Sequence, residues 1–209
     1  MKKLAIIGST ELAMQLAHFA PACGYKVVGF FDDFKEKGES DGITILGKID
    51  DARKVFDDKK FDEIIVGIGY KHLAFKAEVF EKIKAQNIPF ATFIHPTCIV
   101  DETASIGKGT VLYPGCIIDQ RVQIKENTLL NLGCIVSHDS IVGSHCFLSP
   151  AVNLAGFCNI GEQCNLGINT TVINNVSICD HVQTGGSTLV IRTIEKPGLY
   201  VGVPAIRSK

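Results

Sequence analysis

The sequence lacks long apolar runs and clusters of basic residues. No stretch approaches the roughly 20 apolar residues that a membrane helix needs, and the short apolar run at the N-terminus ends at Gly8, which argues against a signal peptide. With 21 basic and 22 acidic residues, the formal charge is −1. The sequence therefore offers no electrostatic footprint for nucleic acid or for an acidic membrane surface. We expect a cytoplasmic protein with neither partner.

The eight cysteines include no CxxC pair, and no secretory signal accompanies them. A disulfide framework or a metal site is therefore not the favoured interpretation, and we predict no metal.

Before about residue 90 the chain alternates short apolar runs with helical patterns. Strand, helix and strand repeated in this way predict a small parallel sheet with helices on its faces, an α/β Rossmann-like βαβ unit over residues 1–90. The segments that carry this pattern are 4–8, 11–20, 26–31, 62–69 and 71–86.

A six-residue repeat begins at Ile94. Every sixth residue from Ile94 to Ile178 is aliphatic, at all fifteen positions, which a helix of 3.6-residue period would scatter around its axis. Four residues after each of these comes a small or β-branched residue, from Cys98 to Val182. Two such inward residues per hexad fit a triangular parallel β-helix over residues 91–209, with three hexads in each 18-residue coil and five coils in all.

The second column contains six of the eight cysteines. We interpret them as small buried residues. A metal or disulfide role stays open as the alternative, because thiols one coil apart are close enough to pair. These cysteines are Cys98, Cys116, Cys134, Cys146, Cys158 and Cys164.

The hexads IGKGTV, VGSHCF, IGEQCN and LGINTT resemble those of left-handed β-helix acyltransferases, over roughly residues 94–205. With the βαβ unit, the segment SHDSIVG and the closing YVGVPAIR, the whole chain resembles the PglD/NeuD-like bacterial sugar acetyltransferases. The resemblance implies a homotrimer, acetyl-CoA as the donor, and active sites between neighbouring subunits.

His138 is the candidate catalytic base. Val136 and Ser140 occupy the two inward columns, so His138 and Asp139 fall at a corner and point outward. An imidazole can accept the proton of an amine or hydroxyl that attacks a thioester, and Asp139 would fix its tautomer. The resembled family shows His-Glu here. His145 and His181 occupy corner positions too, and we expect both on the surface.

The same resemblance assigns the binding residues. The amide of Gly156 would face the thioester oxygen, Ile168 and Gly186 would line the cofactor, and Phe147 stands where relatives place a cofactor-contacting histidine. The N-terminal unit would bind the acceptor nucleotide, although a full GxGxxG motif is lacking. Its assigned residues are Thr10, Glu11, Leu12, Asp32, Asp33 and Gly69.

The predicted function is therefore acetyl transfer from acetyl-CoA to the amine of a nucleotide-linked amino sugar, a 4-amino-4,6-dideoxyhexose destined for a surface glycan. Two alternatives stay open. One is O-acetylation of a sugar of the sialic acid type, and the other is a non-catalytic β-helix that binds sugar nucleotide. The sequence does not identify the nucleotide base, the sugar's stereochemistry or the acyl chain length.

Overall fold

The computed structural model describes residues 1–40 and 42–208, and the chain divides into two compact units, Met1–Phe93 and Ile94–Lys209. The predicted fold class, a Rossmann-like unit followed by a left-handed parallel β-helix, is confirmed.

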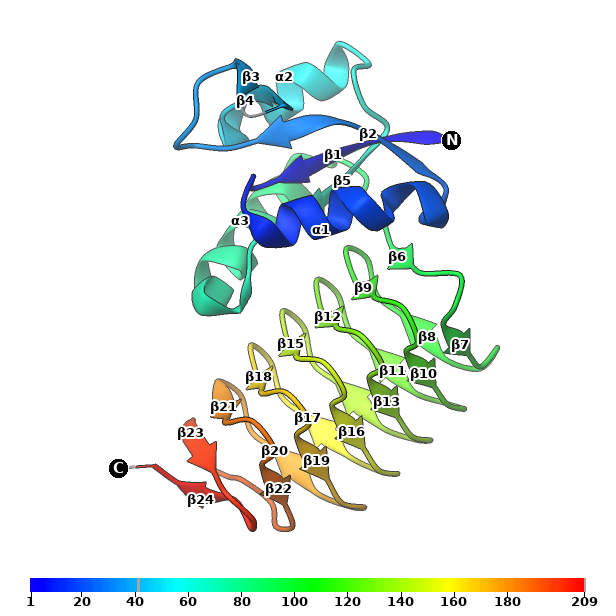
Figure 1. The fold of residues 1–209 in the computed structure, drawn as a ribbon, viewed down its shortest axis with the longest axis vertical. Coiled ribbons are helices and arrows are strands. Elements are labelled where there is room, and N and C mark those ends of the chain that lie inside the picture. The colour runs from blue at the N-terminus through cyan, green and yellow to red at the C-terminus, as the bar shows by residue number, and fades with distance from the viewer. Residues whose placement is uncertain (41, 209) are drawn as a thin grey trace. The chain divides into compact units, whose positions relative to one another are not determined.

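The first unit is built on a five-stranded sheet of order β3-β4-β2-β1-β5 (Figure 1). β1 pairs in parallel with β2 and β5, and β2 pairs in parallel with β4, as the alternation predicts. β3 is antiparallel to β4, and the sequence analysis did not predict this hairpin. The strands are β1 (Lys2–Ile7), β2 (Tyr25–Phe31), β3 (Gly38–Ser40), β4 (Ile43–Gly47) and β5 (Glu63–Val66).

Helices cover the sheet because β1 is apolar on both sides. Ala5 and Ile7 share a core cluster with Val55 and Phe80, and consecutive residues of β1 point to opposite faces. All four residues from Leu4 to Ile7 are completely buried, so neither face of β1 is open to water. The helices are α1 (Glu11–Phe19), α2 (Ala52–Asp57) and α3 (Leu73–Ala85), with 3₁₀ turns η1 (Ala20–Cys23), η2 (Ile49–Asp51) and η3 (Tyr70–His72).

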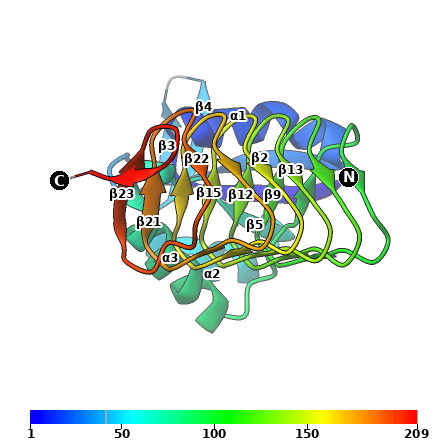
Figure 2. The same ribbon diagram turned by 90° about the horizontal axis from the view of Figure 1, so that it is seen from below.

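The second unit stacks short strands into three parallel faces (Figures 1 and 2). The β6 face holds β6 (Phe93–Ile94), β9 (Val111–Leu112), β12 (Leu129–Leu130), β15 (Phe147–Leu148), β18 (Asn165–Leu166) and β21 (Val182–Thr184). The β7 face holds β7 (Ile99–Val100), β10 (Ile117–Ile118), β13 (Ile135–Val136), β16 (Asn153–Leu154), β19 (Thr171–Val172) and β22 (Leu189–Val190). The β8 face holds β8 (Ser105–Ile106), β11 (Gln123–Ile124), β14 (Ile141–Val142), β17 (Asn159–Ile160) and β20 (Ser177–Ile178).

Strand pairing follows the predicted 18-residue period, as in the pairing of Ile117 with Ile135. The aliphatic column is buried from Leu112 to Ile178. Its first member, Ile94, is 37% exposed, contrary to the expectation that every member is enclosed. Inward-facing residues at six-residue intervals also continue beyond the end of the predicted columns, as far as Val190. β23 (Gly198–Val201), parallel to β21 and antiparallel to β24 (Ile206–Arg207), follows the last coil.

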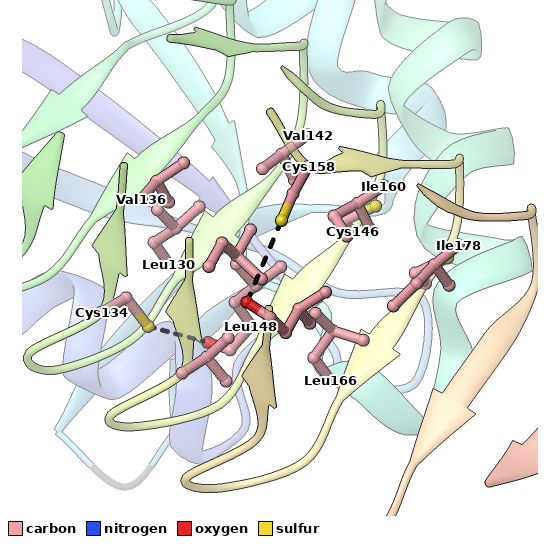
Figure 3. Packing of buried hydrophobic residues seen from close by; sticks show 14 of the residues in the cluster. Leu130, Cys134, Val136, Val142, Cys146, Leu148, Cys158, Ile160, Leu166 and Ile178 are labelled. Carbon is pink, nitrogen blue, oxygen red and sulfur yellow. Dashed lines mark hydrogen bonds between the residues drawn. The ribbon is translucent and has the colours of Figure 1, made fainter. Parts of the chain in front are cut away.

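The second inward column is hydrogen-bonded as well as packed. The thiol of Cys134 donates to the carbonyl oxygen of Ser149, fifteen residues later, at 3.2 Å, and the hydroxyl of Ser140 reaches Ala155 in the same way at 3.0 Å. Figure 3 shows Cys134, Cys146 and Cys158 among the aliphatic side chains of the interior. All eight cysteines are free thiols. The thiols of the six cysteines in the inward column therefore donate to backbone carbonyls at the corners, a role beyond the expected one of filling space.

Each corner requires one residue with a left-handed backbone. From Arg121 to Ser187 a positive φ recurs every sixth residue, at 59° for Asp139 and 61° for His145. Asn, Asp and His tolerate this conformation better than other side chains with a Cβ. The backbone N–H of each such residue donates to the preceding coil, as Asp139 does to the carbonyl of Gln120 at 3.1 Å. This bond fixes the corner and points the side chain outward.

We predict that Thr128→Val destabilises the protein although valine is nearly isosteric. The hydroxyl of Thr128 donates to the carbonyl of Gly143 at 2.8 Å and accepts from the amide of Cys146 at 3.1 Å. Losing both bonds leaves two backbone groups unpaired and should cost about 1–3 kcal/mol of unfolding free energy, measured by denaturant titration. The control is Thr44→Val, at an exposed position of β4 in the first unit, which should change stability little. Equal losses in both variants would contradict the bridging role.

Candidate functional site

The structure places His138 and Asp139 outside the β-helix, in the turn between β13 and β14. Val136 and Ser140 on either side of them point inward and are completely buried. His138 and Asp139 thus lie on the edge between the β7 and β8 faces, as the column pattern predicts. Their side chains are 38% and 21% exposed, so a ligand along this edge can reach both.

His138 and Asp139 form a hydrogen-bonded pair. Nδ1 of His138 lies 2.9 Å from Oδ2 of Asp139. An ionised carboxylate only accepts, so the neutral imidazole carries its proton on Nδ1 and keeps the lone pair of Nε2 free. The shorter aspartate, in place of glutamate, therefore still reaches the imidazole. The arrangement can take up a proton at Nε2.

The preceding coil holds this pair through two residues that the sequence analysis did not identify. Arg121 donates from Nε and Nη2 to the two carboxylate oxygens of Asp139, at 2.6 and 2.8 Å. Asp119 accepts from the backbone amide of His138 at 3.2 Å. The bonds from Arg121, and then from His138, hold the pKa of Asp139 well below its usual range. Arg121 could have been identified from the sequence, because it precedes Asp139 by the 18-residue period and therefore lies beside it in the preceding coil.

Gly156 lies directly over His138 in the following coil. A Cβ at position 156 would stand 2.7 Å from Cε1 and 2.8 Å from Nε2 of the imidazole, so only glycine leaves room for the ring. Phe157 meets the same ring edge-on, with centroids 5.2 Å apart. The imidazole is therefore confined by Asp139, Gly156 and Phe157.

Three of the corner amides make no hydrogen bond within the part of the chain that the structure describes. Among the described residues, the backbone N–H groups of Gly156, Ile168 and Gly186 have no partner in the hydrogen-bond network. Prolines, which lack an N–H, occupy the equivalent corner position at Pro114 and Pro150, which agrees with an amide that the fold leaves unused. These amides are free to donate to a ligand.

The expected cofactor residues occupy two different edges of the β-helix. Gly156 follows β16, on the edge between the β7 and β8 faces, whereas Ile168 and Gly186 follow β18 and β21, on the edge between the β6 and β7 faces. A Cβ on Gly186 would lie 3.1 Å from the side chain of Ile168, so these two residues are neighbours in adjacent coils. Phe147, in β15, is only 5% exposed and offers little surface to a ligand.

His145, expected on the surface, is instead buried. It is 7% exposed, and its Nδ1 lies 2.9 Å from Nδ2 of Asn127, the equivalent corner residue one coil earlier. His181 is exposed as expected.

The first unit contains a pocket of about 440 Å³ at the carboxyl ends of its parallel strands. Four of the six expected nucleotide-binding residues line it, namely Thr10, Asp32, Asp33 and Gly69, whereas Glu11 and Leu12 do not. A Cβ on Gly69 would meet nothing within 4 Å, and its φ is not positive. Neither chain geometry nor packing requires glycine there, so the position leaves open space for a ligand.

The two aspartates have structural partners within the pocket. Asp32 accepts from the hydroxyl of Ser9 at 2.5 Å and from the backbone amide of Phe34 at 2.9 Å. Asp33 accepts from the backbone amide of Ile49 at 2.8 Å. Together they shape the turn after β2, which leaves the ring of Phe34 93% exposed at the pocket.

Aromatic rings at the pocket were not foreseen from the sequence. Phe34 and Phe75 both line the cavity, and Phe75 is 42% exposed. Large apolar side chains left open at a cavity are suited to stacking against a planar ligand.

Over the described part of the chain, no group of three or more His, Cys, Asp or Glu side chains could hold a metal ion. No helix in the same part is long and apolar enough to cross a membrane.

Two family models match the chain. The model of the GMPPB C-terminal domain matches residues 89–194, and that of the PglD N-terminal domain matches residues 3–83. Among solved structures, PerB from Caulobacter crescentus, in complex with CoA and GDP-perosamine, has a TM-score of 0.91 at 26% identity, over 99% of this chain and 97% of that one. The acetyltransferase domain of PglB from Neisseria gonorrhoeae FA1090 has a TM-score of 0.90 at 24% identity, over 100% of both chains.

Curated relatives match a shorter stretch. A UDP-3-O-acylglucosamine N-acyltransferase from Bordetella avium is 39% identical over 67 residues, which make up 32% of this chain and 19% of that protein. This chain therefore spans only about a fifth of the length of the curated relatives it matches.

We predict that Asp139 stays ionised at a pH where ordinary aspartates protonate. Because its pKa is lowered on folding, its contribution to stability is complete above about pH 4 and is lost only as the pH falls through the lowered value. The wild type should therefore melt at a higher temperature than Asp139→Asn at pH 4 and above. This difference in melting temperature should shrink as the pH falls below 4. Glu102→Gln, which removes an exposed carboxylate, is the control. An excess already lost at pH 4 would contradict the lowered pKa.

Proposed function

Because the chain belongs to the PglD-type family of left-handed β-helix sugar acetyltransferases, we propose that it transfers an acetyl group from acetyl-CoA to the amine of a nucleotide-linked amino sugar. The observation that carries this proposal is the pairing, on adjacent coils, of the His138–Asp139 dyad with the free amide of Gly156. PerB, which resembles this chain over nearly its whole length, binds CoA and GDP-perosamine.

The chemistry is direct transfer in this proposal. The amine nitrogen attacks the thioester carbonyl carbon while Nε2 of His138 takes its proton, and Asp139 supports the imidazolium that forms. The carbonyl oxygen becomes an oxyanion, to which the N–H of Gly156 donates. Collapse of the intermediate breaks the carbon–sulfur bond. The thiolate of CoA leaves and takes the proton from His138, which restores the base.

The two edges with free amides support a donor site between subunits. Gly156 lies on one side of the β7 face, and Ile168 and Gly186 lie on its other side. One extended cofactor can contact both sets when the edge of one β-helix lies beside the opposite edge of a second. The outer side of the β7 face also carries an apolar ladder of Ile99, Ile117 and Ile135, exposed by 66%, 38% and 37%. We therefore propose a homotrimer packed through β7 faces.

The pocket of the first unit would hold the acceptor's nucleotide. Phe34 supplies an exposed ring for the base, Gly69 leaves space, and Thr10 offers a hydroxyl at the start of α1. Glu11, in the first turn of α1, would repel a phosphate placed there. We therefore assign binding to Thr10, Asp32, Asp33 and Gly69 rather than to Glu11 and Leu12. A sugar nucleotide and acetyl-CoA are metabolites of the cytoplasm, where we place the protein, and the product is proposed to enter a surface glycan.

We predict that His138→Ala lowers kcat by about 10²–10⁴-fold, the usual worth of a general base, while leaving the circular dichroism spectrum unchanged. The assay incubates the protein with acetyl-CoA and 4-amino-4,6-dideoxyhexoses linked to UDP, GDP or dTDP, and follows release of free thiol. His181→Ala, at another exposed corner, is the control and should retain wild-type kcat.

Unchanged turnover in His138→Ala would remove this residue as the base. Transfer to a sugar hydroxyl, with no transfer to any amine, would favour the O-acetyltransferase alternative. Absence of acetyl-CoA binding in calorimetry would favour a non-catalytic sugar-nucleotide-binding protein.

We predict that Ile117→Asp dissociates the trimer, because a carboxylate at the centre of the apolar ladder would be buried without a partner. Light scattering coupled to size exclusion should give the mass of the monomer, and acetyl transfer should be lost with the shared site. Gln123→Asp, on the outer side of the β8 face, should remain trimeric. A trimeric Ile117→Asp variant would contradict packing through β7 faces.

A further inference from the structure

Arg121 fixes the orientation of the Asp139 carboxylate from the adjacent coil. Its two bonds, Nε to Oδ1 and Nη2 to Oδ2, are parallel and engage both oxygens. Such a bidentate pair restricts rotation of the carboxylate far more than a single bond does. Oδ2, which also accepts from Nδ1 of His138, is therefore held toward the imidazole.

The position of Arg121 follows from the coil geometry. Arg121 and Asp139 occupy the same corner of successive coils, with φ of 57° and 59°. The bond from the Asp139 amide to the carbonyl of Gln120 holds the two turns together. The two side chains thus leave the backbone from equivalent points, one coil apart.

A third coil anchors Arg121 in turn. The backbone amide of Arg121 donates to Oγ1 of Thr103 at 2.8 Å, and that hydroxyl donates to Asp101 at 2.6 Å. Thr103 precedes Arg121 by one coil at the same corner. A line of hydrogen-bonded groups therefore runs through three coils, from Asp101 to His138.

We propose that Arg121 is a positioning residue, which orients Asp139 and offsets its charge so that His138 stays free to accept a proton at neutral pH. This inference rests on the proposed acetyl transfer. The charged groups around the imidazole are Asp139 at Nδ1, Asp119 at the backbone amide, and Arg121 behind Asp139. Without Arg121, the uncompensated carboxylate of Asp139 would stabilise the imidazolium, and more of His138 would carry its proton before the reaction begins.

The first test replaces Arg121 with methionine, which keeps an unbranched apolar stem but removes the charge and the hydrogen bonds. We expect kcat to fall roughly 10-fold, with KM for acetyl-CoA and for the acceptor little changed. The acid limb of the pH–rate profile should move to higher pH. Arg121→Lys keeps the charge and loses the bidentate geometry, so it should lower kcat and leave the acid limb in place.

The second test needs no turnover. NMR titration of the histidine rings, with His138 identified by its absence from the His138→Ala spectrum, should show His138 titrating at higher pH in Arg121→Met than in the wild type. The matched control is Arg53→Met, because Arg53 forms the same two-bond pair with Asp57 on α2 of the first unit. That variant should match the wild type in both measurements.

Wild-type kcat together with an unmoved His138 titration in Arg121→Met would overturn the inference. If the wild type transfers no acetyl group, the proposed function is contradicted, but the histidine titration still tests the role of Arg121. Thermal melts show whether each variant is folded. Arg121→Gln, which is polar and uncharged, replaces the methionine variant in both tests if that variant does not fold.

Discussion

The parallel hydrogen-bond ladder between coils, with partners 18 residues apart, is the constraint on which the β-helix and its site depend. It places residues one period apart at about the 4.8 Å spacing of neighbouring strands. His138 meets Gly156 and Arg121 meets Asp139 for this reason alone. The contacts of the site are thus consequences of register, and an insertion of one residue between the two members of either pair would separate that pair.

The corners explain why functional side chains can stand outside such a tightly packed solenoid. A left-handed residue is unfavourable for most side chains, but here its N–H is bonded to the preceding coil, as in the bond from Asp139 to Gln120. The corner residue just before it, such as His138, keeps its side chain outside, and the N–H at this position makes no ladder bond. The repeat therefore provides outward side chains and free amides at regular intervals, and the sequence determines which of them become useful.

The sequence predicted the β-helix well because each hexad repeats one physical requirement, an aliphatic and a small residue turned inward. It also placed His138 outward, since its inward neighbours Val136 and Ser140 left no other direction. Arg121 was not predicted because it lies 18 residues before Asp139 in the sequence, although the 18-residue period already places the two on adjacent coils. In the first unit no period exists. The edge strand Gly38–Ser40 carries no apolar pattern, and the exposure of Phe34 depends on a turn that Asp32 holds through tertiary structure.

The inward cysteines bear on the choice between direct transfer and an acyl-enzyme. A nucleophilic thiol must reach the ligand and ionise readily. Cys134, whose thiol lies beside that of Cys116, raises the pKa of Cys116 to about 12, and burial adds to this effect. Burial also raises the pKa of Cys158, the inward residue two positions after Gly156. Both thiols lie inside the solenoid, whereas His138 lies outside it. The fold thus separates its thiols from its base, which favours an attack by the acceptor amine itself.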